Sequence, residues 1–300
     1  AHAGVIVLDE RRILVVVPAR GGSKGIALKN LQPLAGRPLV AWVGHTVATL
    51  DWVDRAVVST DHLLIREAAL ASGLEAPFLR PQELSGDRIG DIEVLSHALT
   101  ATEADDGQHY DVVVMLQPTS PLRRPEQVLA TVRKLIDEDL DAVWTVSPTD
   151  LKAHPLKQLV LDEKGCMDYF DPRGAEIIAR QQLQPVYHRN GVAYALTRSC
   201  LLEQRSLIGK RAGAVVIDEP LANIDTPDDL MRAESLIAGS EISAQPLLSA
   251  PAATSKFTAR PRLVVDVDGV IATASTDPDY NKARPITENV ARINALYEAG

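Results

Sequence analysis

The chain has 300 residues, of which 46% are apolar, and its formal net charge at pH 7 is −9. This length allows one large domain or two small ones, with enough apolar residues for a buried core. The negative charge argues against binding to nucleic acid or to an anionic membrane surface.

Short apolar strands alternate with helices along the first three quarters of the chain. Runs rich in Val and Ile predict strands at 13–17, 56–59, 112–116, 142–146 and 214–217. The pattern between them predicts helices at about 38–50, 62–72, 91–103, 125–137 and 227–237. Repeated βα units imply a three-layer α/β fold with a mostly parallel, Rossmann-like sheet. Ligands of such sheets bind beyond the carboxyl ends of the strands.

Two segments interrupt this alternation. Residues 148–190 are rich in Pro, Arg and Gln and predict an insertion, with a long irregular surface loop as the alternative. Residues 239–261 are mostly Ser, Ala, Pro, Thr and Gln, which is typical of a linker. We therefore expect a first domain at 11–238 and the start of a second at 262–300.

A glycine-rich loop with three cations follows the first predicted strand. It reads Pro18-Ala19-Arg20-Gly21-Gly22-Ser23-Lys24-Gly25 and continues to Lys29-Asn30. Glycine lets the backbone approach a ligand closely, and successive N–H groups in such a turn form an anion-binding concavity. The spacing matches neither a P-loop nor the dinucleotide fingerprint. The loop predicts a polyphosphate ligand, most simply a nucleoside triphosphate, with a solvated basic turn as the alternative.

This loop and several later motifs resemble those of the acylneuraminate cytidylyltransferases, also called CMP-sialic acid synthetases. The family loop reads Pro-Ala-Arg-x-x-Ser-Lys-Gly and then Lys-Asn, and the resemblance covers about residues 13–236. It implies a nucleotidyltransferase that uses CTP, a 2-keto sugar acid and Mg²⁺. It also implies that Arg20 and Lys29 are catalytic cations. The nucleotide-binding residues would be Ala19, Arg20, Gly21, Gly22, Ser23, Lys24 and Asn30.

The resemblance assigns base recognition to Arg80, in the segment Leu79-Arg80-Pro81-Gln82-Glu83-Leu84. Arg only donates hydrogen bonds, which suits the O2 and N3 acceptors of cytosine. The alternative is a surface arginine before a turn. The residues that follow, Asp87-Arg88-Ile89-Gly90-Asp91, depart from the Ser/Thr-rich turn of the family and leave the rest of base recognition open.

Sugar-acid binding is implied for five residues. Gln117 belongs to the family run Gln117-Pro118-Thr119-Ser120-Pro121-Leu122. The alternative for this run is a purely structural turn. Lys157 and Arg180 lie in the insertion, which in the family carries the contact of a homodimer and reaches the partner's site. A solvated surface position is the alternative for both. Asn190 and Tyr194 belong to an Asn-Gly-x-x-Tyr segment, where a tight turn and a packed tyrosine are the alternatives.

The metal site of the family reads Asp-Ile-Asp, and this chain has Asn223-Ile224-Asp225. Mg²⁺ prefers hard oxygen ligands and often takes one or two carboxylates together with substrate phosphates. The resemblance therefore implies Asp225 as a catalytic metal ligand and Asn223 as a weak one. The alternative for Asp225 is an acid favoured by the dipole of the following helix.

A second signature lies near the end of the chain. The segment Val264-Val265-Asp266-Val267-Asp268-Gly269 resembles the first motif of the haloacid dehalogenase superfamily, in which the first Asp attacks phosphorus. The remaining catalytic residues of that superfamily lie well downstream of this motif. We expect residues 262–300 to be a truncated fragment without phosphatase activity, from a bifunctional parent protein.

The expected activity is transfer of CMP from CTP to the anomeric hydroxyl of an N-acylneuraminate or related nonulosonate, with release of pyrophosphate. The alternatives are a CMP-KDO synthetase, a phosphatase, or a sugar-nucleotide binder whose metal site is weakened by Asn223. Two cysteines without metal spacing, Cys166 and Cys200, favour a reducing, cytoplasmic location. No apolar run approaches the 18 residues of a membrane span.

Overall fold

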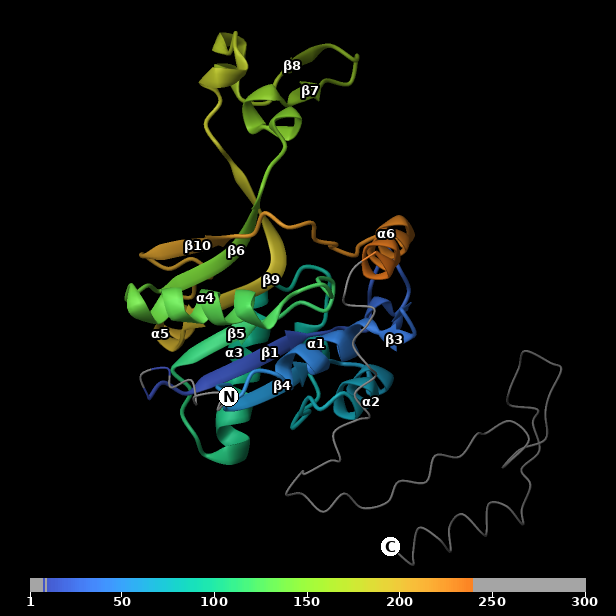
Figure 1. Ribbon diagram of the computed structural model, residues 1–300, viewed down its shortest axis with the longest axis vertical. Coiled ribbons are helices and arrows are strands. Elements are labelled where there is room, and N and C mark those ends of the chain that lie inside the picture. The colour runs from blue at the N-terminus through green and yellow to red at the C-terminus, as the bar shows by residue number, and fades with distance from the viewer. Residues whose placement is uncertain (1–7, 9, 240–300) are drawn as a thin grey trace, which may run out of the picture. The chain divides into compact units, whose positions relative to one another are not determined.

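The computed structural model describes residue 8 and residues 10–239. Within this part, six strands form one sheet in the order β10-β6-β9-β5-β1-β4 (Figure 1). Strand β9 is antiparallel to both its neighbours, and the other pairs are parallel. The strands are β1 (Ile13–Pro18), β4 (Arg55–Ser59), β5 (Val112–Met115), β6 (Ala142–Pro148), β9 (Tyr187–Thr197) and β10 (Ala212–Val216).

Helices cover both faces of the sheet, so successive residues of a central strand are buried on opposite sides. Along β1, Val15 and Val17 pack in the cluster of α1, α2 and α4, whereas Leu14 and Val16 pack in the cluster of α3 and α5. The helices are α1 (Leu39–Val47), α2 (Leu63–Ala71), α3 (Asp91–Asp106), α4 (Pro125–Asp137), α5 (Arg198–Leu202) and α6 (Pro227–Ala238). This arrangement confirms the predicted three-layer α/β fold.

Within the six-stranded sheet, β9 is the strand that the sequence analysis did not predict. The Asn190-Gly191 pair was expected to form a tight turn, and this expectation is wrong because both residues lie inside β9. The strand bulges there: from the Trp144–Tyr194 pair to the Val146–Arg189 pair, β6 advances by two residues and β9 by five. The bulge bends β9 toward the carboxyl end of β5.

The segment between β6 and β9 projects away from the sheet (Figure 1). It contains the antiparallel pair β7 (Leu159–Leu161) and β8 (Met167–Tyr169). Its four short 3-10 helices are η3 (Leu151–Ala153), η4 (Pro155–Lys157), η5 (Pro172–Glu176) and η6 (Arg180–Gln182). Asp150 and Asp171 cap two of these helices by accepting backbone hydrogen bonds. The segment has an internal structure and is not an irregular loop.

The predicted linker at 239–261 lies outside the described residues except for Gly239. The predicted fragment at 262–300, with Asp266 and Asp268, also lies outside them. Among the residues that the structure describes, no helix combines the length and the apolar character needed to cross a bilayer.

Candidate active site

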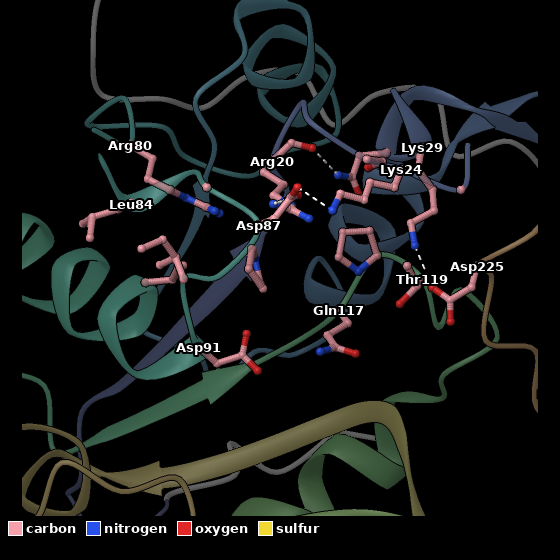
Figure 2. A pocket seen from close by; sticks show the side chains of 18 of the residues that line it. Arg20, Lys24, Lys29, Arg80, Leu84, Asp87, Asp91, Gln117, Thr119 and Asp225 are labelled. Atoms are coloured by element: carbon pink, nitrogen blue, oxygen red, sulfur yellow. Dashed lines mark hydrogen bonds and ion pairs between the residues drawn. The ribbon is translucent and has the colours of Figure 1, made fainter. Parts of the chain in front are cut away.

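A cavity of about 630 Å³ opens at the carboxyl end of β1 (Figure 2). Its walls come from the glycine-rich loop, the segment from Arg80 to α3, the turn after β5 and the segment before α6. The side chains that carry its chemistry are Arg20, Lys24, Lys29, Asn30, Arg80, Asp87, Asp91, Gln117, Asn223 and Asp225. The topology thus brings together residues up to about 200 positions apart, at the edge where ligands of such sheets bind.

Hydrogen bonds hold the glycine-rich loop against the ends of the strands. The backbone N–H of Ala19 donates to the carbonyl of Ser59 at 2.9 Å, and that of Gly21 donates to Asp61 Oδ1 at 2.8 Å. The buried Asn30 side chain donates to the carbonyl of Arg20 at 2.9 Å. Asn30, predicted as a nucleotide ligand, therefore also fixes the path of the loop on which Arg20 lies.

The cations of the loop face acidic groups inside the cavity. Asp87 bridges two of them, with Oδ1 at 2.9 Å from Arg20 Nη1 and Oδ2 at 2.7 Å from Lys24 Nζ. The ion pair with Lys24, with a smaller contribution from Arg20, lowers the pKa of Asp87 below its usual value. One carboxylate thus occupies the position between two cations that an anionic phosphate would take.

Lys29 lies deeper in the cavity and pairs with Asp225 at 2.8 Å between Nζ and Oδ1. The other oxygen of Asp225 accepts a hydrogen bond of 3.2 Å from the side-chain amide of Asn223. Gly25 makes this arrangement possible, because a Cβ at that position would lie 2.4 Å from the carbonyl oxygen of Asp225. The loop and the segment before α6 therefore meet at a glycine.

Arg80 lies at the opposite end of the cavity and is only 5% exposed. Its Nε donates to Ser59 Oγ at 3.0 Å, and its Nη2 donates to the Ser59 carbonyl. Burial lowers the pKa of Arg80 to about 10. The guanidinium is held rigidly beside the apolar side chains of Leu84, Ile89 and Val94, which suits recognition of a flat base.

Gln117 lies on the cavity floor after β5, next to Gly191 of β9. Gly191 has a φ of +74°, and a Cβ there would lie 2.7 Å from Gln117 Oε1. The buried Arg123 joins the two segments by donating to the carbonyls of Gln117, Gly191 and Val192. The sequence analysis assigned no role to Arg123, although it directly follows the Gln-Pro-Thr-Ser-Pro-Leu run.

Asn190 and Tyr194 make structural hydrogen bonds in this chain. Asn190 Oδ1 accepts from Thr145 Oγ1 at 2.6 Å, and its Nδ2 donates to Ser147 Oγ at 3.1 Å. The buried Tyr194 hydroxyl accepts from the Gly191 N–H at 2.9 Å. Asn190 lines a second cavity of about 470 Å³, whereas Tyr194 lines neither of the two cavities described.

The second cavity adjoins the first, because Asn223 lines both. Its other residues are Ser147, Pro148, His188, Arg189, Asn190, Ile217, Asp218, Glu219 and Leu221. Lys157 and Arg180 are exposed in the projecting segment and line neither cavity. A single chain therefore does not bring these two predicted ligands to the others.

The three-layer sheet, the cationic glycine-rich loop and the polar cavity at the strand ends are the features of a nucleotidyltransferase. The chain belongs to the cytidylyltransferase family, whose sequence profile matches residues 14–236. It is 31% identical over 236 residues to the CMP-N,N'-diacetyllegionaminic acid synthase of Legionella pneumophila, covering 75% of this chain and 96% of that protein.

Another relative and one solved structure agree with this assignment. The N-acylneuraminate cytidylyltransferase of Streptococcus agalactiae is 31% identical over 222 residues, which cover 73% of this chain and 51% of that protein. The chain thus spans about half the length of the streptococcal relative. A CMP:2-keto-3-deoxy-manno-octonic acid synthetase complexed with CTP shares the fold, with a TM-score of 0.56, 21% identity, and coverage of 76% of this chain and 99% of that one.

Proposed function

We propose that the protein transfers CMP from CTP to the anomeric hydroxyl of a nonulosonic acid, an N-acylneuraminate or a close relative, and releases pyrophosphate. The observation that carries this proposal is the cation cluster of Arg20, Lys24 and Lys29 inside a cavity that the buried Arg80 also lines. Membership of the cytidylyltransferase family and the names of the matched relatives support CTP and a sugar acid as the substrates.

The residues act by positioning and by charge. The hydroxyl oxygen of the sugar acid forms a bond to the α-phosphorus, its proton is lost, and the bond from that phosphorus to the pyrophosphate oxygen breaks. Negative charge increases on the leaving pyrophosphate, and Arg20, Lys24 and Lys29 lie where they can stabilise it. Such preorganised cations need no covalent intermediate with the protein.

Mg²⁺ is the cofactor that we propose for this site. The carboxylate of Asp225 pairs with Lys29, and the side chain of Asn223 lies against that carboxylate in the same cavity; both residues carry the hard oxygen donors that Mg²⁺ prefers. With substrate phosphates as further ligands, this donor set fits the ion. When bound, Mg²⁺ would neutralise phosphate charge. We expect EDTA to abolish pyrophosphate release and added Mg²⁺ to restore it.

We further propose that the protein is a homodimer formed through the projecting segment. Apolar side chains are exposed there, including Leu161 (70%), Met167 (72%), Phe170 (67%) and Ile178 (93%). Patches of this kind favour a protein interface. In a dimer, Lys157 and Arg180 would serve the partner's acceptor site.

We propose a cytoplasmic location, where CTP is available and the free thiols of Cys166 and Cys200 stay reduced.

A panel of acceptors tests the proposed function. Pyrophosphate release is measured with CTP and, in turn, N-acetylneuraminic, N,N'-diacetyllegionaminic, pseudaminic and 2-keto-3-deoxy-octonic acids. We expect one of the nine-carbon acids to be turned over fastest. Fastest turnover of the eight-carbon acid would overturn the nonulosonate assignment, and absence of pyrophosphate with every acceptor would overturn the transferase assignment.

A further inference from the structure

Asp91 is the first residue of α3, and its side chain extends into the cavity that Arg80 also lines (Figure 2). Arg80 and Asp91 line the same cavity, and the charge of each partly opposes the shift that burial causes in the pKa of the other. Leu84, Ile89 and Val94 line the cavity beside them. An acceptor and a donor therefore face one apolar recess.

Asp91 differs from an acid that only stabilises the start of a helix. In the described part of the chain, its carboxylate accepts no hydrogen bond and forms no ion pair. Glu93, on the same helical turn, instead pairs with Arg205 at 3.3 Å outside the cavity. Burial raises the pKa of Asp91 above its usual value, despite the opposing charges of Arg189 and Arg80. A partly buried carboxylate without a donor costs free energy, which a ligand that donates to it would recover.

Arg80 also has an unused hydrogen-bonding group. Ser59 accepts hydrogen bonds from Nε and Nη2, whereas Nη1 donates to no group among residues 8 and 10–239. The side chain is nearly fully buried and still lines the cavity. The recess therefore offers a fixed donor from Arg80 and a free acceptor from Asp91.

We infer that Asp91 accepts a hydrogen bond from the 4-amino group of cytosine while Arg80 donates to the acceptors on the same edge of the ring. This inference rests on the proposed use of CTP. Cytosine presents an amino donor at C4 next to the acceptors N3 and O2, and a carboxylate is a suitable partner for that amino group. Uracil has an acceptor at C4, which would face the carboxylate without a proton between them.

The expected effect on specificity is large. A hydrogen bond to a charged group contributes enough to change kcat/KM by about 10- to 100-fold. A site built around a substrate NH also rejects an analogue that lacks it, because the buried acceptor is then left unpaired. Asp91 would therefore supply much of the preference for CTP over UTP.

The experiment measures kcat/KM by pyrophosphate release with one fixed sugar acid and three nucleotides. These are CTP, UTP and the triphosphate of the 2-pyrimidinone riboside, which has hydrogen in place of the 4-amino group. We expect the kcat/KM of the wild type to be about 10- to 100-fold lower for the analogue than for CTP. Asp91→Ala should process CTP and the analogue at rates within about threefold of each other. Asp91→Asn should accept UTP better, because its amide can donate to O4.

Glu93→Gln is the matched control, since it removes a charge from the same turn of α3 but does not line the cavity. It should keep the wild-type CTP-to-UTP ratio. Equal wild-type rates with CTP and the analogue would overturn the inference. This comparison uses only the wild-type protein, so it does not depend on the folding of a variant. The inference would also be overturned if Asp91→Asn kept the wild-type CTP-to-UTP ratio of kcat/KM, or if it lost kcat/KM equally with CTP and UTP. Failure of the wild type to use CTP at all would instead refute the proposed function.

Discussion

At the scale of single residues, the account depends on cations that stabilise charge on the substrate phosphates, and Lys29 is the clearest case. Its ammonium group is largely buried and pairs only with Asp225 among the described residues. Preorganised charge next to a reacting phosphate contributes several kcal/mol to catalysis. We expect Lys29→Ala to lower kcat/KM for CTP by about 100- to 1,000-fold without loss of folding.

Lys134→Ala provides the control for that substitution. Lys134 pairs with Glu138 on the surface of α4, and it lines neither cavity. Activity assays and thermal unfolding of both variants give the comparison. Near wild-type turnover in Lys29→Ala would show that Lys29 is not a catalytic cation.

Asp87 competes with the substrate for Arg20 and Lys24. Because ion pairing lowers its pKa, the carboxylate stays charged from neutral pH down through the usual titration range of Asp. The competition should therefore persist across pH 5 to 8, and would be relieved only when the pH falls through the lowered pKa. We expect Asp87→Asn to reduce the KM for CTP by about two- to fivefold at pH 7. An increased KM would indicate that Asp87 itself binds the substrate.

At the scale of elements, the junction between the glycine-rich loop and the segment before α6 depends on Gly25. A side chain there would collide with the backbone of Asp225, so that one of the two segments would have to shift. We expect Gly25→Ala to lower the Tm by about 4–8 °C, corresponding to about 2 kcal/mol in a domain of this size. Gly22→Ala is the control, because nothing lies within 4 Å of its Cβ position. Equal Tm values for the two variants would contradict this role of Gly25.

The sequence predicted the strands that can be recognised from the pattern of their own residues. The strands that became β1, β4, β5, β6 and β10 lie within three residues of their expected positions, since short runs rich in Val, Ile and Ala are easily recognised. Strand β9 was missed because its polar residues, from Tyr187 to Asn190, and its internal glycine are typical of a loop. Only pairing with β5 and β6, distant in sequence, makes it a strand.

The candidate site was predictable where a motif carries the chemistry, as in the glycine-rich loop. Interactions between distant segments were not predictable, because they depend on the fold. The ion pair of Asp87 with Arg20 and the hydrogen bonds from Arg123 to the carbonyls of Gly191 and Val192 belong to this group. For Asp91, the available signal was the departure of its segment, from Arg88 onward, from the Ser/Thr-rich turn of the family, whereas Asp87 keeps the Asp that the family often has.

At the scale of the whole molecule, the distance of Lys157 and Arg180 from both cavities requires a second chain if they bind the substrate. We expect light scattering to give a dimer, and Ile178→Asp to shift it toward monomer with lower activity. Mixing Lys29→Ala with Arg180→Ala, followed by subunit exchange, should restore activity, because one site of each heterodimer would be intact. No gain on mixing would place Arg180 in its own subunit's site or outside any site.

The most direct measurement is a crystal structure of the protein with CTP and Mg²⁺. We predict that the triphosphate contacts Arg20, Lys24 and Lys29 in place of Asp87, and that the cytosine lies between Arg80 and Asp91. A nucleotide bound elsewhere, with the Asp87 ion pairs intact, would contradict the account.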